Sequence, residues 1–422
     1  MELAVLSLMD IAAVLLTLSA AFGWLNHKFL PLSRSVGLLV MSVLTSLLLI
    51  ALDAAIPSVQ LLDQLADGLR QIDFAEVVVN GMLAFLLFAG ALHVDLETLR
   101  SRAVPVFLLA VFGTLISTAL VGMMFWLICS LMNLPVPLAW AFVFGALISP
   151  TDPVAVLSTL RNTNVPKELQ IETEGEALFN DGVGIVLFTI LLRFASSGDG
   201  AQVSTADVAE LLIREAGGGI VLGLMTGYVA YRAMRLIDDY AIEVLISLAL
   251  VTGTYAVALH LHVSGPLSMV TAGLLIGDRG PRYAMSERTQ GYLFALWTLI
   301  DEILNSVLFL LIGLETLILR FDLRSFGIAA ATVPIVLFAR FASVGVQPFL
   351  FGWTRLLSLR NAPFLTWAGV RGGISVALAL SLPDSPARTA ILASTYAVVL
   401  FSIIIQGSTL GWVARRTVGT TG

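Results

Sequence analysis

Charged side chains are scarce in this chain of 422 residues, because Asp, Glu, Lys and Arg together make up only 12% of it. A soluble globular protein carries about 25%. The apolar share is 58% and the mean hydropathy is +0.94. This composition excludes a soluble enzyme, a disordered protein and a protein that binds nucleic acid. It predicts an integral membrane protein whose immediate surroundings are lipid.

Cysteine is almost absent as well. Cys129 is the only one in the sequence, and it lies inside an apolar run. A single thiol cannot form a disulfide within the chain, and thiolate metal sites require several cysteines. The sequence therefore predicts neither a disulfide framework nor a thiolate metal site, and we expect no cofactor.

What the chain does contain is a series of thirteen apolar runs separated by short polar joints. The runs fall at about 2–25, 32–52, 74–94, 104–132, 137–160, 171–195, 208–235, 240–262, 264–278, 289–319, 326–356, 363–382 and 387–413. A helix needs about 20 apolar residues to cross the hydrocarbon, where it satisfies its own backbone. We predict an all-α membrane protein of about 13 spans, one transmembrane domain over 1–422 with no soluble domain. Residues 54–73 are predicted to form an amphipathic surface helix.

The distribution of basic residues predicts the orientation of these spans. If the N-terminus lies outside, 15 of the 23 Lys and Arg fall in inward joints and six in outward joints, while Arg340 and Arg371 lie within spans. Positive charge gathers on the cytoplasmic side of membrane proteins. We therefore expect an outside N-terminus and a cytoplasmic C-terminus.

Two runs, the fifth and the twelfth, are interrupted by helix-breaking residues. The interruptions read ISPTDPVAV at 148–156 and AGVRGGISVA at 368–377. Discontinuous helices in corresponding halves are typical of transporters built from inverted repeats, with the site near the bilayer midplane. We predict two inverted six-helix repeats, about 2–195 and 240–413, joined by a linking helix at about 208–235. Spans 5 and 12 would then be two discontinuous crossing helices.

The first interruption has the chemistry of a cation site. Pro153 has no amide hydrogen to donate to the carbonyl of Ser149, so the helix must loosen there. Carbonyl oxygens are then left beside the Thr151 hydroxyl and the Asp152 carboxylate. Such hard oxygens suit a hard cation, as in ion pathways. The alternative is a simple proline kink with a hydrogen-bonded Asp152.

A second polar motif, ETEGEALFNDG at 172–182, opens the sixth run. At helical spacing, Asp181 shares its face with small residues, which leave room for an ion or water: Thr173, Ala177 and Gly184. A carboxylate inside the membrane costs free energy, and its presence there usually indicates a function. Glu176 faces partly away and needs a partner of its own. Glu172 and Glu174 are equally compatible with a solvated position at the cytoplasmic end.

Arg340 and Arg371 are the two basic residues placed inside predicted spans. An unpaired Arg at that depth is costly, so each is expected to meet a carboxylate or freed carbonyls and to act as a structural partner. The tenth run also carries Asp301, Glu302 and Asn305. These three residues suit either the lining of a water path or polar packing contacts.

The motifs SPTDPVAVLS, EGEALFNDG and GVRGGISVALAL, in this order, resemble those of the monovalent cation:proton antiporter-1 family, the NhaP-type sodium/proton exchangers. The resemblance covers nearly the whole chain. It implies a thirteen-helix inverted-repeat fold, a homodimer in the cell (inner) membrane, and an elevator-like movement of a six-helix core. It also implies electroneutral exchange of Na+ or Li+ for a proton, and hence a transporter rather than an enzyme.

The resemblance also implies roles for single residues. Asp181 would be the carboxylate shared by cation and proton. Thr151 and Asp152 would contribute to the Na+ site. Asn180 would be the neighbour that marks the branch exchanging one cation per proton.

A core ion pair would fall on Glu176, with Arg340 favoured over Arg371 as its partner. The sequence departs from the family pattern at two positions. Ala177 stands where relatives commonly have a Ser that ligates the cation, and Ala89 stands where some relatives have an acidic group. Both departures remove oxygen ligands, and a water or Thr173 is a possible substitute.

Other functions remain to be weighed against Na+/H+ exchange. A K+/H+ antiporter of the same fold would use the same residues. A cation channel would explain the carboxylates but not an Arg beside the pathway. An intramembrane aspartyl protease would carry Gly-x-Gly-Asp, whereas this chain reads Asn-Asp-Gly-x-Gly at 180–184.

Overall fold

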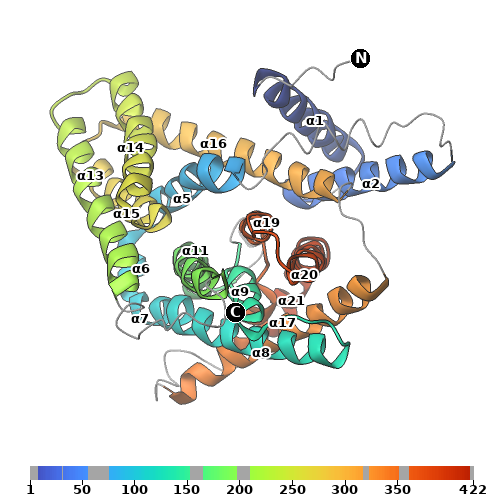
Figure 1. Cartoon of the computed structure of the whole chain (residues 1–422). Helices are drawn as coiled ribbons and strands as arrows, with labels where there is room; N and C mark the ends of the chain where they lie inside the picture. Colours follow the sequence, from blue (N-terminus) through green and yellow to red (C-terminus); the bar gives the residue numbers. More distant parts are fainter. Residues whose placement is uncertain are drawn as a thin grey trace.

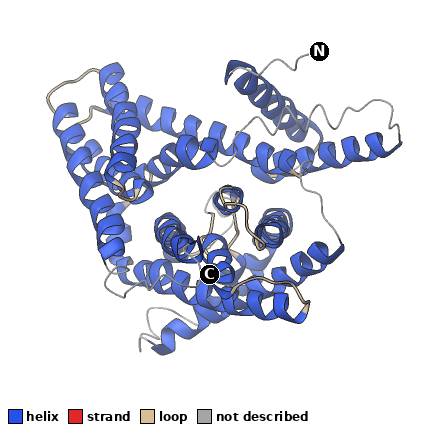
Figure 2. Cartoon of the chain, in the orientation of Figure 1, coloured by secondary structure: helices blue, strands red, loops and turns tan. Residues whose placement is uncertain are grey.

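The computed structural model describes residues 8–30, 32–55, 76–152, 165–196, 210–316, 323–350 and 361–418. Within these ranges the chain forms helices joined by short loops, and no strand occurs among them (Figure 2). The predicted all-α class is confirmed. Residues 56–73 of the predicted surface helix lie outside the described ranges.

The first half of the chain supplies the helices of the first six predicted spans. In chain order they are α1 (Leu8–Phe29), α2 (Arg34–Ala55), the π-helix η1 (Val77–Met82), α5 (Leu83–Leu92), α6 (Leu96–Ser101), α7 (Ala103–Phe107), the π-helix η2 (Leu108–Gly113), α8 (Thr114–Leu131), α9 (Leu138–Ile148) and α11 (Lys167–Ser196).

The second half continues in the same way. Its helices are the π-helix η3 (Ile213–Gly217), α13 (Gly218–Met234), α14 (Tyr240–Leu261), α15 (Gly265–Tyr283), α16 (Glu287–Glu315), α17 (Leu323–Leu350), α18 (Ala362–Trp367), α19 (Gly373–Leu380), α20 (Arg388–Phe401), the π-helix η5 (Ser402–Gly407) and α21 (Ser408–Thr417).

Each of the thirteen predicted spans coincides with helix in the described ranges, and eight of these helices are long and apolar enough by themselves to cross a membrane. The ninth span is longer than its apolar run predicts. The run ends at residue 278, but α15 continues to Tyr283. Asp278 and Arg282, one turn apart, form an ion pair of 3.3 Å that supports these last turns.

The helices fall into two groups (Figure 1). The core group consists of α8, α9, α11, α17, α19 and α20, which pack on one another, with α11, α19 and α20 viewed nearly end-on in Figure 1. The panel group consists of α1, α2, α5 and α13 to α16. Within it, α15 packs against α5 and α13, and α16 against α2 and α5. The groups meet where α15 contacts α11 and where α16 contacts α19.

Candidate ion-binding site

The two interrupted spans meet at their breaks. Helix α9 ends at Ile148, and Thr151 and Asp152 are not helical, while residues 368–372 separate α18 from α19. The Asp152 amide donates a hydrogen bond to the Val370 carbonyl at 2.7 Å. The amide of one break and the carbonyl of the other thus satisfy each other, since both lie where a span is interrupted.

Arg371 anchors this crossing. Its Nη1 atom donates to the carbonyls of Ser149 and Pro150, the latter at 2.9 Å, and its side chain is 1% exposed. Pro153 has no amide hydrogen and so cannot donate a helical hydrogen bond to the Ser149 carbonyl. The guanidinium therefore replaces a missing helical donor and leaves a fixed positive charge inside the crossing.

The close approach of the breaks depends on glycine. A Cβ atom at Gly372 would collide with the Asp152 carboxyl group, and one at Gly184 would collide with the ring of Pro150. These glycines allow α19 and α11 to lie directly against the broken end of α9. Any larger residue at either position would push the Asp152 segment away from its place.

Asn180 ties the first break to α11. Its Nδ2 atom donates to the Thr151 hydroxyl at 2.8 Å, and its Oδ1 atom accepts from the Thr151 amide at 3.3 Å. Both side chains are buried. The amide therefore fixes in position the Thr151 hydroxyl, which borders the same cavity as Asp181.

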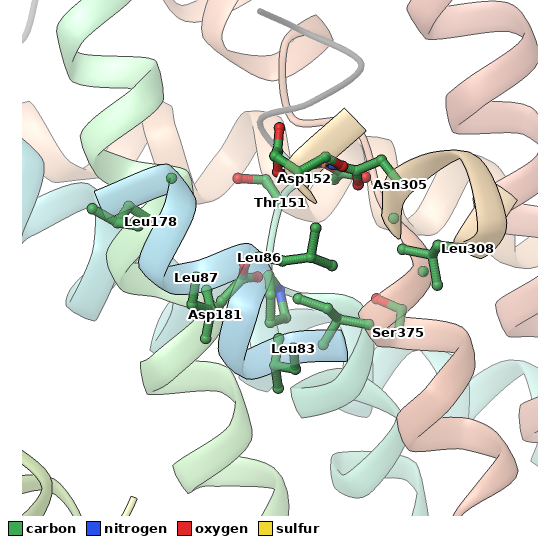
Figure 3. Close-up of a pocket in the computed structure, with 16 residues that line it drawn as sticks. Leu83, Leu86, Leu87, Thr151, Asp152, Leu178, Asp181, Asn305, Leu308 and Ser375 are labelled. Atoms are coloured by element: carbon green, nitrogen blue, oxygen red, sulfur yellow. Dashed lines mark hydrogen bonds between the residues drawn. The ribbon is translucent and has the colours of Figure 1, made fainter. Parts of the chain in front are cut away.

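Asp181 faces a cavity of about 110 Å³. The polar side chains that border this cavity are Thr151, Asp152, Asp181, Asp301, Asn305 and Ser375, and most are labelled in Figure 3. The Asp181 side chain is 5% exposed, yet no group among the described residues donates a hydrogen bond to it. A buried carboxylate normally has partners, so Asp181 is a candidate for binding a group that enters the cavity.

The opposite wall of the cavity is apolar. Leu83, Leu86 and Leu87 of α5 project toward Asp181, as Figure 3 shows. Ser375, on the first turn of α19, also borders the cavity and is 2% exposed. Sequence reasoning missed Ser375, because a lone Ser in an apolar helix forms no pattern.

Glu176 lies behind the cavity rather than in it. It pairs with Arg340 through two hydrogen bonds, one to Nη1 and one to Nη2 at 2.8 Å, and Arg340 Nη2 also donates to the Leu365 carbonyl at 3.2 Å. The Glu176 and Arg340 side chains are 1% and 5% exposed. Between the two arginines considered for Glu176, the structure therefore pairs it with Arg340, whereas Arg371 is bonded to carbonyls.

The remaining glutamates of α11 have different surroundings. Glu172 is buried and accepts from Arg102 at 3.2 Å. Glu174 accepts from Gln170 at 2.9 Å and is half-buried. The solvated position that the sequence left open is therefore wrong for Glu172.

Comparison with known proteins identifies the family. Residues 13–416 match the sequence model described as "Sodium/hydrogen exchanger, transmembrane". The chain belongs to this family. As a sodium/hydrogen exchanger family member with apolar helices along its length, it is a multi-pass membrane protein.

Relatives and solved structures agree with this assignment. The chain is 42% identical to the Na+/H+ antiporter NhaP of Pseudomonas aeruginosa over 97% of both chains. It is 37% identical to the Na+/H+ antiporter NhaH of Halobacillus aidingensis, covering 81% of this chain and 83% of that protein. The fold is similar to that of the sodium proton antiporter MjNhaP1 from Methanocaldococcus jannaschii, with a TM-score of 0.76 at 20% identity over 97% and 98% of the two chains. The predicted family and NhaP-type membrane fold are confirmed, and these relatives are transporters rather than enzymes.

Proposed function

We propose that this protein is a Na+/H+ antiporter, also able to carry Li+, that exchanges one cation for one proton at Asp181 by alternating access. The observation that carries the proposal is the buried Asp181 carboxylate, which faces a cavity beside two crossing helix breaks and accepts no hydrogen bond from the described residues. The family and the names of the relatives support the same activity.

The cation ligands are oxygen atoms around the cavity. Na+ binds to the Asp181 carboxylate, with the Asp152 carboxylate and the Thr151 hydroxyl completing part of the shell, while Asn180 holds Thr151 in place. Because Ala177 has no hydroxyl, a water molecule fills the remaining position. Ligands of this kind replace the hydration shell of the ion.

Exchange follows from the competition for one carboxylate. Asp181 binds either a proton or a cation, so loading the one requires release of the other. Arg371 and Arg340 stay charged, since Arg is effectively always protonated in proteins. The Glu176–Arg340 pair holds the core group together and takes no part in ion binding. The charge carried across is therefore the same in both directions, and transport is electroneutral.

Alternating access arises from movement of the core group against the panel group. The α5 leucines form the barrier past which the loaded site moves. The repeats at about 2–195 and 240–413, linked by 208–235, form the two related halves of the transporter. The protein works as a homodimer in the cell (inner) membrane, with the N-terminus outside and the C-terminus in the cytoplasm, as the distribution of basic residues favours.

The test is Asp181→Asn in purified, reconstituted protein. A neutral amide cannot bind a proton or a cation in place of a carboxylate, so Na+-driven proton movement should fall to background while the protein stays folded. Asp152→Asn should raise the apparent KM for Na+ and keep some transport. The matched control is Asp384→Asn, because that carboxylate is 97% exposed in a loop.

Proton movement is measured by the dequenching of a pH-sensitive dye after Na+, Li+ and K+ are added in turn. Response to Na+ and Li+ supports the proposal, whereas response to K+ alone would establish a K+/H+ antiporter. Retained Na+-driven exchange in Asp181→Asn would refute the assigned site. Proton dissipation without any added cation would indicate a channel.

A further inference from the structure

The cavity beside Asp181 has walls from both helix groups. The core group contributes the helix breaks and α11, and the panel group contributes α5 and α16. On the panel side the α5 residues are three leucines and Gly90, whereas α16 brings Asp301 and Asn305 to the cavity. A carboxylate therefore borders the site on a helix that does not belong to the core group.

Asp301 lies on a continuous polar stripe of α16. Its polar members, Thr298, Asp301 and Asn305, are spaced three and four apart, so they share one helix face. Thr298 is exposed, Asp301 is half-buried, and Asn305 is 5% exposed. From Thr298 through Asp301 to Asn305, the exposure falls toward the cavity. This order favours entry of a hydrated ion along the stripe.

The end of α5 joins this stripe. The Nε2 atom of His93 lies 3.1 Å from the Thr298 hydroxyl, and the imidazole packs edge-on against the Phe294 ring at 5.5 Å. His93 is exposed. Polar groups thus extend from the outer edge of the molecule, through Thr298, to Asp301 and the cavity.

Local contacts hold the Asp301 side chain in place. Asn305 Nδ2 donates to the Asp301 carbonyl at 2.9 Å and to its Oδ1 atom at 3.0 Å. The adjacent acid, Glu302, has a different position, since it pairs with Arg34 of α2 on another face of α16. The two neighbouring carboxylates therefore differ in that Asp301 borders the cavity and Glu302 does not.

We propose that Asp301 is a staging carboxylate, which binds the hydrated monovalent cation at the cavity entrance before the cation reaches Asp181. This inference rests on the proposed function and adds a second cation-binding residue to it. A carboxylate in a cleft with low-dielectric walls raises the local cation concentration. Because Asp301 belongs to the panel group, it cannot travel with the core group. It therefore acts on the side of the membrane where α16 begins, and Asp181 acts on both.

The test is Asp301→Asn, with the apparent KM for Na+ measured separately in everted and right-side-out vesicles. We expect KM to rise by about tenfold on the side where α16 begins, in line with the gain from focusing charge in a cleft. On the other side KM should stay unchanged, and the maximal rate should stay within about twofold on both sides. The matched control is Glu302→Gln, which removes the adjacent carboxylate and should leave both KM values unchanged.

Two results would overturn the staging role: unchanged KM values on both sides, or equal increases on both sides. Either would leave the proposed function intact if Asp181→Asn still abolished exchange. If Asp181→Asn transported Na+ normally, the proposed function would fail instead.

Thiol labelling tests the entry path without altering Asp301. Thr298→Cys should react with a charged, membrane-impermeant thiol reagent from one side only, whereas the neighbouring Leu299→Cys should not react, although Leu299 is 56% exposed. The native Cys129 is 0% exposed and serves as an unreactive background. Absence of labelling at Thr298→Cys, or equal labelling of both variants, would contradict an aqueous path along this stripe.

Discussion

Glu176→Gln should destabilise the protein more than any other single carboxylate-to-amide change in α11. The substitution keeps the shape of the side chain and removes its charge. Arg340 then loses its partner, while Leu365 supplies one remaining acceptor. Arg371 lies close enough to interact electrostatically with both members of the pair. Removal of Glu176 therefore leaves two buried guanidinium groups near each other without the carboxylate with which both interact.

The expected size of the effect follows from the burial of the pair. Removing one member of a buried ion pair costs about 3–5 kcal/mol of unfolding free energy. Unfolding entropy is about 2.1 cal/mol/K per residue, and the chain has 422 residues. Dividing the cost by the entropy of the whole chain gives a decrease of roughly 3–6 °C in Tm.

The assay is thermal unfolding in detergent, followed by the loss of the monodisperse peak in size-exclusion chromatography. The control is Glu172→Gln, the same change one turn earlier in the same helix. The partner of Glu172, Arg102, has a side chain that is 31% exposed, so water compensates for the lost charge. We expect the control to lose less than half of the Tm change of Glu176→Gln. A charge-swapped double variant of Glu176 and Arg340 should recover part of the loss.

Two outcomes would refute this reasoning. If Glu176→Gln were as stable as the parent, the pair would contribute nothing to stability. If both Glu176→Gln and Arg340→Gln were fully stable but lost all transport, Glu176 would belong to the proton path rather than to the framework of the core group.

Further predictions concern transport. Raising the Na+ concentration should move the acid limb of the pH–rate curve to lower pH, because protons and Na+ compete for Asp181; an acid limb that ignores Na+ would indicate a separate pH sensor. Clamping the membrane potential of proteoliposomes with valinomycin and K+ should leave the Na+-driven pH change unaltered, and a dependence on the imposed potential would reveal a second titrating group. Gly372→Ala should lower the rate by about a hundredfold, the loss typical of a binding group displaced by about 1 Å, because its methyl group collides with Asp152. Gly291→Ala, where a methyl group meets nothing within 4 Å, should keep full activity in the same flux assay.

The fold was predictable from the sequence because its main determinant is local. Every apolar run long enough to cross a bilayer became helix within the described ranges, and the prolines and glycines at 150–153 and 369–373 marked the breaks. The four π-helical segments within the described ranges carried no such signal. A π-helix such as η2 within the span from Ala103 to Leu131 shifts one turn by a single residue, and apolar composition is insensitive to that shift.

The sequence predicted which residues belong to the site better than it predicted the partners of these residues. Intramembrane charge selected Asp152, Asp181, Glu176 and the two arginines, since each is too costly to be incidental. Whether Arg371 meets a carboxylate or a carbonyl depends on a segment 221 residues away in the chain. Such a pairing is decided by the crossing of the two spans, and helical periodicity reaches only a few turns.

The charge that Arg371 places inside the crossing has a consequence for leakage. With Asp152 and Asp181 ionised and Arg371 cationic, the unloaded site carries one net negative charge. A bound proton or Na+ brings that total to zero. Moving an uncompensated charge past the α5 leucines costs several kcal/mol, so in the proposed mechanism the unloaded core group would stall while either loaded form passes. Slippage, the return of the carrier without cargo, would then be suppressed by electrostatics, without a separate gate.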